Sequence, residues 1–279
     1  MIESRKINKI AVIKVGGDVL LDAQEISGLA KNIQQLYQQK WNIVLLHGGG
    51  PQVNQLQSIY GLTSNKVAGR RITSKADLKV VKQAIAGEVN VNLVAELVKQ
   101  GLPAFGCHGA SAQLIQATKR PPILVSGGGD QPIDFGEVGD VTAINAALLN
   151  SLLDLDLIPV IATLGISQQG EIYNINADTT VVQIATALSA NLLLLTTQVG
   201  AVFKDLDHPE TRIKSINPQQ AKDLIAQGVI QGGMIPKVEE AIGLLQQGVE
   251  TIAIVSGKHS GAFLDVAQGS GAYGTRISL

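Results

Sequence analysis

The sequence predicts a three-layer α/β/α sandwich around a mainly parallel β-sheet, and three observations support this fold class. Short, wholly apolar runs recur along the chain, as expected of strands that are covered on both faces. Between them lie longer segments with the apolar spacing of amphipathic helices. Glycine-rich turns directly follow two of the apolar runs, where a strand would lead into a helix. Such alternation is typical of a parallel-rich sheet with helices on both faces.

In the first half of the chain, the elements are predicted from apolar runs, helical spacing and turn residues. Pro51 suits the first position of a helix that follows the second strand. Gly101 is a stop signal for the helix before it. We predict strands at Ile10–Lys14, Asn42–Leu46 and Leu102–Gly106, and helices at Asp22–Gln39, from about Gln52 to Tyr60, and at Lys75–Gly87 and Val89–Gln100, which form one or two helices.

The second half continues the alternation after an interruption. Ala110–Val141 contains several prolines and glycines, and we expect short strands and turns there, including a hairpin outside the main sheet. We predict helices at Thr142–Leu153, Asp178–Ala190, Pro218–Gln227 and Lys237–Gln247, and strands at Leu157–Ala162, Leu192–Thr196, Thr251–Ser256 and Gly274–Leu279.

The sequence contains no segment that resembles an interdomain linker, a low-complexity region or an internal repeat. We therefore expect a single domain over residues 1–279 that consists of two lobes. The division is expected near Ile166–Tyr173, which gives an N-terminal lobe of about residues 1–170 and a C-terminal lobe of about residues 171–279.

The composition limits the possible functions. With 279 residues, a formal net charge of −1 and scattered basic residues, the chain lacks the basic face that nucleic-acid binding needs. No apolar run approaches the ~20 residues of a membrane span, and the N-terminus lacks the apolar stretch of a signal peptide. The single cysteine, Cys107, excludes an internal disulfide. We expect a cytoplasmic protein that binds neither nucleic acid nor membrane.

Two glycine loops are candidates for anion binding. Gly16-Gly17 and Gly48-Gly49-Gly50 lie just past the ends of apolar strands, where ligands bind in parallel α/β sheets. Glycine lets backbone N–H groups approach a ligand closely, and the helix after Gly50 directs its N-terminal amides into the same space. The alternative is that these glycines only form tight strand-to-helix turns.

Two lysines and an aspartate are candidates for catalysis. Lys14 ends a buried strand, which suggests a side chain that emerges into a cleft; the alternative is a lysine whose ammonium reaches the surface. Lys237 is predicted at a helix start, where its charge opposes the helix dipole unless it faces a phosphate. Asp178 is predicted at a helix N-terminus, where capping and catalysis are compatible. Fixed positive charge and N–H donors are what phosphoryl transfer needs.

Other known motifs are either absent or not supported by the secondary structure predicted around them. Gly269–Gly274 matches G-x-G-x-x-G, but a predicted strand follows it where a dinucleotide-binding motif needs a helix. The Walker-type phosphate loop and the protein-kinase motifs are absent from the sequence. The four histidines have no metal-ligand spacing, so we expect no metal site built from protein side chains. His47, beside the triple glycine, is expected to be structural or a minor contributor to the site.

Seven strings, in this order, resemble the acetylglutamate kinase branch of the amino-acid kinase family and span nearly the whole chain. They are Lys14–Gly17, His47–Pro51, Gly69–Thr73, Asp134–Gly139, Tyr173–Asp178, Gly232–Lys237 and Gly274-Thr275. The resemblance implies an enzyme that uses ATP, with Mg²⁺ bridging its phosphates, to phosphorylate the side-chain carboxylate of N-acetyl-L-glutamate in arginine biosynthesis. It also implies that the N-terminal lobe binds the acyl amino acid and the C-terminal lobe binds ATP.

The resemblance implies roles for individual residues as well. Lys14 would stabilise the phosphoryl group in transfer, Lys237 would stabilise the leaving ADP oxygens, and Asp178 would hold both ammonium groups. Arg71 would pair with the substrate α-carboxylate, which its planar guanidinium suits. The expected substrate-binding residues are Gly49, Gly50, Arg71, Asn174 and Asn176, and the expected nucleotide-binding residues are Gly16, Gly17, Thr197 and Lys237.

Three segments depart from the family pattern. The usual Leu-Thr-Asp is replaced by Leu195–Gln198, and the segments Cys107–Ser111 and Arg120–Asp134 are also atypical. An N-succinylglutamate, an N-blocked aminoadipate or a carrier-linked substrate would use the same residues, and a non-catalytic sensor is the alternative from another class. The nine residues before the first strand are too few for the extra N-terminal helix of this family's arginine-inhibited hexamers. We therefore expect an arginine-insensitive homodimer.

Overall fold

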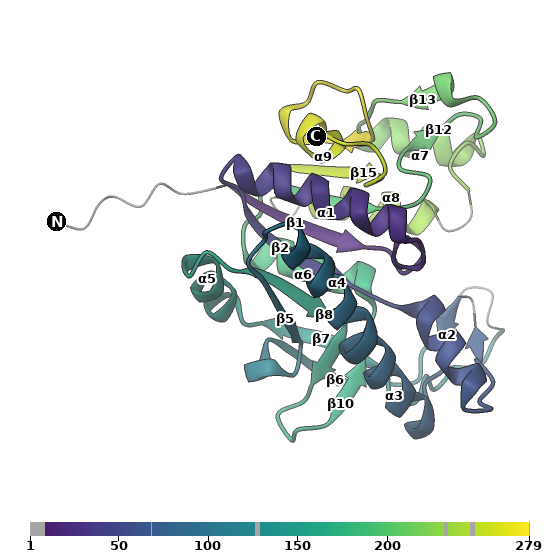
Figure 1. Cartoon of the computed structure of the whole chain (residues 1–279). Coiled ribbons are helices and arrows are strands. Elements are labelled where there is room, and N and C mark those ends of the chain that lie inside the picture. Colours follow the sequence, from purple (N-terminus) through teal and green to yellow (C-terminus); the bar gives the residue numbers. More distant parts are fainter. Residues whose placement is uncertain (1–8, 68, 126–128, 232–233, 246–248, 279) are drawn as a thin grey trace.

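An eight-stranded sheet forms the centre of the structure (Figure 1). The computed structural model describes residues 9–67, 69–125, 129–231, 234–245 and 249–278. Neighbouring strands of this sheet are parallel except for β15 and β16, which confirms the predicted mainly parallel sheet. From one edge to the other, the strands are β14 (Ser215–Ile216), β16 (Thr275–Ile277), β15 (Thr251–Val255), β11 (Leu192–Thr196), β1 (Ile10–Val15), β2 (Asn42–His47), β8 (Ile158–Ala162) and β5 (Ala104–His108).

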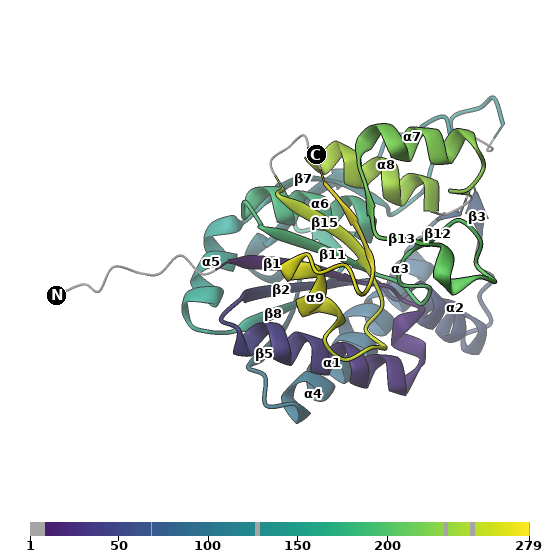
Figure 2. The same ribbon diagram turned by 90° about the horizontal axis from the view of Figure 1, so that it is seen from above.

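Helices cover both faces of this sheet, as predicted (Figure 2). Side chains alternate along β1, so Val12 packs into the core on one face, whereas Ala11 and Ile13 pack into the core on the other. By the same alternation, Lys14 lies on the face of Val12. That face is covered by α5 (Ala146–Asp154), α6 (Ala177–Ala187), α7 (Pro218–Ala226) and α8 (Met234–Leu245), and the face of Ile13 by α1 (Ala23–Gln38), α4 (Asn90–Lys99) and α9 (Ala262–Gln268).

The segment after β5 supplies two strands of a second sheet, which confirms that short strands lie outside the main sheet, and the segment after β8 supplies the other two. Its strand order is β10 (Ile172–Asn174), β9 (Leu164–Ile166), β6 (Ile115–Lys119) and β7 (Gly139–Ile144). An antiparallel bridge between Ile123 and Ile133 forms the expected hairpin within the segment after β5. Two further pairs of short strands are β3 (Lys66–Val67) with β4 (Arg70–Arg71), and β12 (Val202–Phe203) with β13 (Arg212–Ile213).

One predicted helix begins too early. Thr142–Leu153 was expected to be helical, but Thr142 to Ile144 form the end of β7, and α5 starts at Ala146. The reason is local, because Asn145 is the N-cap and its Oδ1 accepts a hydrogen bond from Leu148 N–H at 3.1 Å. The residues before this cap pair with β6 instead.

The helical region between β4 and β5 is continuous and contains a π-helix. It consists of α3 (Lys75–Val81), the π-helix η2 (Lys82–Val89) and α4, whereas the sequence predicted one or two α-helices. α2 (Gly50–Ile59) begins at Gly50, slightly before its predicted start at about Gln52, and has Pro51 in its first turn. π-Helical turns are rare and frequently lie at functional sites.

The helix that carries Lys237 starts earlier than predicted. α8 begins at Met234, so Lys237 lies within its first turn and not at its first residue. Short 3₁₀ helices lie at Val19–Leu21 (η1), Ser111–Gln113 (η3) and Pro209–Thr211 (η4). Among the helices of the described residues, none combines the length and the apolar composition needed to cross a membrane.

Candidate active site

The loops after β1, β2 and β11 lie side by side at the carboxyl ends of these central strands. Because these strands are adjacent and parallel, their carboxyl ends meet there. Gly17 comes so close to the loop after β2 that a Cβ atom at this position would lie 2.8 Å from Pro51 Cδ. The two glycine loops identified in the sequence therefore contact each other, and a side chain at position 17 would push them apart.

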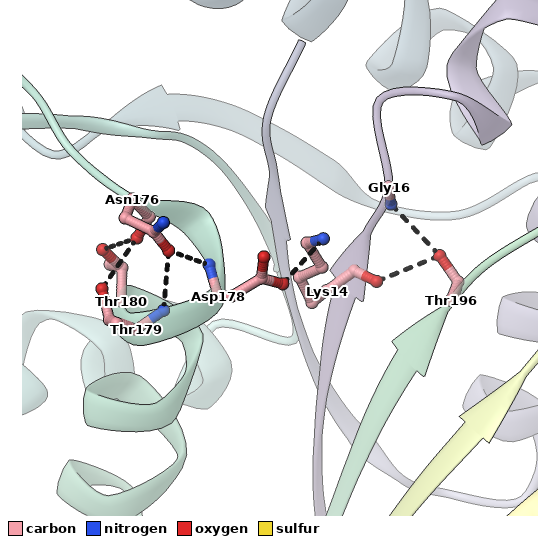
Figure 3. Close-up of polar contacts among 7 residues, drawn as sticks. All are labelled: Lys14, Gly16, Asn176, Asp178, Thr179, Thr180 and Thr196. Carbon is pink, nitrogen blue, oxygen red and sulfur yellow. Dashed lines mark hydrogen bonds and ion pairs between the residues drawn. The ribbon is translucent and has the colours of Figure 1, made fainter. Parts of the chain in front are cut away.

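Lys14 and Asp178 form an ion pair between β1 and the start of α6 (Figure 3). Lys14 Nζ lies 2.8 Å from Asp178 Oδ1, and the two side chains are 11% and 33% exposed. The pairing follows from the fold, since α6 covers the face of the sheet on which Lys14 lies. A cation fixed in this way beside glycine loops is suited to stabilise an anionic group.

Asn176, not Asp178, is the N-cap of α6. Asn176 Oδ1 accepts hydrogen bonds from Asp178 N–H at 2.8 Å and from Thr179 N–H at 3.0 Å (Figure 3). The interpretation of Asp178 as the N-cap of this helix is therefore wrong. Its carboxylate lies in the first helical turn, where the helix dipole favours negative charge, and it is available to Lys14.

Thr196 connects the end of β11 to the end of β1. Its Oγ1 donates a hydrogen bond to Lys14 O at 3.0 Å and accepts one from Gly16 N–H at 3.4 Å (Figure 3). Thr196 is 1% exposed. It therefore fixes the backbone on both sides of Val15, where the chain leaves the sheet.

Thr197 occupies the position at which the family usually has aspartate, and it stabilises a turn. Its Oγ1 accepts a hydrogen bond from Gly200 N–H at 2.9 Å, and its own N–H donates to Val255 O at 3.1 Å. A carboxylate at this position would offer the same kind of acceptor. The departure thus preserves the turn, while a nucleotide contact from Thr197 stays a prediction.

A pocket of about 170 Å³ brings together most of the predicted substrate-binding residues. Gly49, Gly50, Arg71 and Asn174 all line it. Asn174 Nδ2 donates a hydrogen bond to Thr73 Oγ1 at 3.1 Å. Asn176 does not line this pocket, although the next residue does; the other lining residues are Gly48, Val53, Val81, Ile85, Thr163, Ile175 and Ala177.

Arg71 is held by four hydrogen-bond acceptors. Its Nη1 donates to Gln57 Oε1 and, at 2.7 Å, to Ser64 Oγ. Its Nη2 donates to Asn54 Oδ1 at 2.5 Å and to Gly50 O at 3.3 Å. These contacts hold the planar guanidinium in one orientation at the pocket wall.

The charge of Arg71 is not neutralised by its direct partners. All four acceptors are uncharged, and Asp77 is linked to the guanidinium only through Gln57, whose Nε2 donates to Asp77 Oδ1 at 2.5 Å. Burial lowers the pKa of Arg71, and the charge of Asp77 opposes this effect. An anion in the pocket would provide the direct charge partner that the guanidinium lacks among the described residues.

Two cavities in the C-terminal half are lined in part by the segment after β11. One of about 420 Å³ has a largely apolar wall that includes Val199, Phe203 and Ile230. The other, of about 290 Å³, includes the basic residues Arg212 and Lys258. The side chain of residue 237 lies outside the described part of the chain, so its predicted meeting with Lys14 remains a prediction.

The apolar wall of the pocket that Arg71 lines, and the polar residues behind it, were not predicted from the sequence. Val53, Val81 and Ile85 have the spacing of ordinary core residues, and nothing in the sequence marks them as ligand contacts. Gln57 and Asn90 did carry a signal, because each is a polar residue at an apolar-face position of a helix. Both are buried, at 1% and 5% exposure, and buried polar side chains need partners.

Residues 9–256 match the family model described as the amino acid kinase family. The chain belongs to the amino acid kinase family. The paired Lys14 and Asp178 and the two glycine loops all lie within the matched residues.

Relatives of this amino acid kinase confirm the resemblance to acetylglutamate kinases. The chain is 39% identical over 267 residues to the acetylglutamate kinase of an Anaeromyxobacter species (strain Fw109-5), covering 96% of this chain and 98% of that protein. It is 41% identical over 245 residues to the acetylglutamate kinase of Methanopyrus kandleri, covering 88% and 94%. The structure of N-acetylglutamate synthase from Neisseria gonorrhoeae superposes with a TM-score of 0.78 at 23% identity, covering 97% of this chain and 59% of that one, and shows the same fold.

Proposed function

We propose that this amino acid kinase transfers the γ-phosphoryl group of ATP to the γ-carboxylate of N-acetyl-L-glutamate, as a step of arginine biosynthesis. A carboxylate oxygen forms a bond to phosphorus while the bond from phosphorus to the ADP oxygen breaks. The products are N-acetyl-L-glutamyl 5-phosphate and ADP. The observation that carries the proposal is the Lys14–Asp178 pair beside two glycine loops, next to the pocket that Arg71 lines. Near full-length similarity to acetylglutamate kinases indicates the acceptor.

The reaction needs no general base. A γ-carboxylate with a pKa of about 4.3 is already ionised at neutral pH. The barrier comes from bringing this anion to a polyanion, and fixed cations and N–H donors oppose that repulsion. In the proposed mechanism, Lys14 stabilises the phosphoryl group, and Gly17, Gly49 and Gly50 donate backbone hydrogen bonds to its oxygens. Asp178 keeps the ammonium of Lys14 in position.

The acyl amino acid is proposed to bind in the N-terminal lobe, about residues 1–170. Arg71 would bind the α-carboxylate, since its guanidinium is oriented at the pocket wall without a direct anionic partner among the described residues. Val53, Val81 and Ile85 offer an apolar wall for the acyl group. Asn174 and Asn176 would lie where the two substrates meet.

ATP is proposed to bind in the C-terminal lobe, about residues 171–279. The cavity of about 420 Å³ offers an apolar wall for a purine base, and it extends to Gln231, shortly before α8 with Lys237. Among the described residues, no cluster of three or more His, Cys, Asp or Glu side chains could hold a metal ion. Mg²⁺ that enters with ATP would need no such cluster, because Mg²⁺ usually keeps several waters and is held largely by substrate phosphates. When bound, Mg²⁺ would neutralise phosphate charge.

The proposed function is tested by ADP release with Mg-ATP and four acceptors. They are N-acetyl-L-glutamate, N-succinyl-L-glutamate, N-acetyl-L-aminoadipate and L-glutamate. We expect fast turnover with the first compound alone. Preference for N-succinyl-L-glutamate or N-acetyl-L-aminoadipate would replace the proposed acceptor but keep the chemistry. Nucleotide binding without ADP formation from any acceptor would favour the non-catalytic sensor.

Substitution of Arg71 by lysine is expected to weaken substrate binding selectively. Lysine keeps the charge but loses the planar, bidentate geometry. The KM for the acyl amino acid should rise by roughly 10- to 100-fold, which corresponds to about 1.4–2.7 kcal/mol, while the KM for ATP should stay nearly constant. Steady-state kinetics with each substrate varied in turn measures both values. An unchanged KM for the acyl amino acid would contradict the role of Arg71.

A homodimer is proposed through the face formed by β5 and α4. β5 is the end strand of the main sheet, and exposed apolar side chains gather on it and on the neighbouring helix: Val91 is 62% exposed, Val98 55% and Phe105 42%. An open edge strand beside an apolar helix stripe favours pairing with a second copy.

The dimer proposal predicts that Val98→Asp dissociates the protein. A charge buried at the centre of an interface should raise the dimer dissociation constant by roughly tenfold or more. Leu155→Asp is the control, because Leu155 is 70% exposed directly after α5 and belongs to neither β5 nor α4. Sedimentation equilibrium of both variants measures the mass. A Val98→Asp protein that stays as dimeric as the control would rule out this interface.

A further inference from the structure

His47 is fully buried at the end of β2, directly before the triple glycine. Its Nδ1 lies 2.9 Å from Gly48 O, and its Nε2 lies 2.9 Å from Asn90 Nδ2. A carbonyl oxygen only accepts hydrogen bonds and an amide nitrogen only donates them. Nδ1 therefore carries the proton and donates to Gly48 O, while Nε2 accepts from Asn90. This pattern requires the neutral ring, and burial lowers the pKa of His47 to about 4.

Asn90 fixes the other side of the imidazole. Its Nδ2, which carries two hydrogens, donates the second one to Val160 O at 2.9 Å and also lies 3.4 Å from Cys107 O. These carbonyls belong to β8 and β5. A Cβ atom at Gly106 would lie 2.5 Å from Asn90 Oδ1, so glycine at this position leaves room for the amide. Asn90 thereby ties the ring to two strands of the main sheet.

The hydrogen bond to Gly48 O determines where the next N–H points. In a planar trans peptide, the C=O and N–H groups point in opposite directions. Because Gly48 O is turned toward the buried ring, Gly49 N–H points away from it. Gly49 lines the substrate pocket, and among the described residues its N–H has no hydrogen-bond partner. A free N–H at a pocket wall is suited to donate to an anionic oxygen.

The π-helix η2 packs against Gly49. A Cβ atom at Gly49 would lie 3.2 Å from Ile85 Cγ1 and 3.5 Å from Val89 Cγ2. Both side chains belong to η2, and Asn90 follows it directly. One helical segment therefore packs against Gly49 and also supplies the amide that holds His47.

We propose that His47, held by Asn90, is a positioning residue that aims Gly49 N–H at the oxygens of the group in transfer. The inference rests on the proposed function for the identity of that group, but the orientation of the peptide does not. His47 contacts neither substrate in this account. It acts only through the Gly48–Gly49 peptide.

Two substitutions of His47 distinguish the role of Nδ1 from the role of Nε2. In His47→Asn, the side-chain amide nitrogen lies where Nδ1 was and keeps the donor to Gly48 O. In His47→Gln, the amide reaches toward Asn90 but no longer serves Gly48 O. Both variants lose one buried hydrogen bond and differ in the bond that orients the peptide. We expect kcat to fall about 10²-fold in His47→Gln, as for loss of one oxyanion-type donor. We expect less than a roughly fivefold decrease in His47→Asn, with the KM values of both substrates nearly unchanged in each variant.

Crystal structures of the two variants provide a readout that does not need activity. The Gly48–Gly49 peptide should keep its orientation in His47→Asn and rotate in His47→Gln. Equal kcat values for the two variants, or the native peptide orientation in both, would overturn the inference. If His47→Gln does not fold, Asn90→Ala replaces it, because it frees the ring while keeping its donor; an unchanged kcat in Asn90→Ala would also overturn the inference. A wild-type protein without activity toward N-acetyl-L-glutamate would instead count against the proposed function, and the peptide orientations would still decide the inference.

Discussion

Replacing Lys14 with alanine is expected to lower kcat about 10³-fold, at the upper end of what loss of one preorganised donor costs. The ammonium is largely buried, is paired with Asp178 at 2.8 Å and lies beside both glycine loops. Its charge is therefore already in place when negative charge shifts during phosphoryl transfer. The KM values should change by less than about tenfold, because an interaction that is strongest in the transition state affects kcat most.

The matched control for this prediction is Lys99→Ala. Lys99 lies on α4, its side chain is 70% exposed, and it pairs with Glu96 at 3.4 Å. Steady-state rates of both variants with saturating Mg-ATP and acyl amino acid give the comparison, and thermal unfolding checks that each is folded. A Lys14→Ala enzyme with the kcat of the control would remove Lys14 from the mechanism.

Replacing Asp178 with asparagine is expected to lower kcat about 10²-fold. Asparagine has the same shape but no charge, so Lys14 keeps a neighbour and loses its ion pair. The ammonium is then free to adopt other rotamers, and a misplaced cation stabilises the transition state poorly. The helix itself should remain, because Asn176 supplies the N-cap of α6.

Asp223→Asn, on the exposed face of α7, is the control for charge removal at another helix. The two carboxylates differ in their partners, since Asp223 accepts a hydrogen bond from Gln219 and, within the described part of the chain, pairs with no lysine. A combined Lys14→Ala and Asp178→Asn variant extends the test. If the pair acts as a unit, the double variant should be about as slow as Lys14→Ala alone. Additive losses would show that Asp178 acts independently of Lys14.

The central strands of the main sheet were predictable because they are nearly continuous apolar runs, whereas the two-residue end strand β14 was not predicted. β11 was predicted with its observed bounds, Leu192–Thr196. Lys14 was identified because a charged residue at the end of such a run needs an explanation. Its partner Asp178 was expected only from the family resemblance, because the apolar pattern does not say which face of the sheet α6 covers.

The errors at element ends have local causes. A side-chain cap at Asn145 starts α5 later than the apolar spacing of residues 142–153 suggests. Asn176 and Asp178 both suit a helix N-terminus, and only the hydrogen bonds of Asn176 Oδ1 show which one caps α6. Composition cannot separate two good capping residues that lie two positions apart.

The polar network behind the glycine loop was beyond sequence reasoning for a different reason. His47 and Asn90 are 43 positions apart in the sequence, and they meet because Asn90, at the junction of η2 and α4, contacts the end of β2. The π-helix η2 that precedes Asn90 was not predicted either, since its residues have ordinary helical composition. Long-range polar contacts of this kind depend on packing, which a local pattern does not encode.

If this protein phosphorylates the γ-carboxylate of N-acetyl-L-glutamate, its product is an acyl phosphate. Acyl phosphates react with hydroxylamine to give hydroxamates, so trapping with hydroxylamine during turnover distinguishes phosphorylation of a carboxylate from simple ATP hydrolysis. With Mg-ATP and N-acetyl-L-glutamate, we expect one equivalent of N-acetylglutamyl hydroxamate for each ADP released. Release of ADP without hydroxamate, or no release of ADP, would contradict the account.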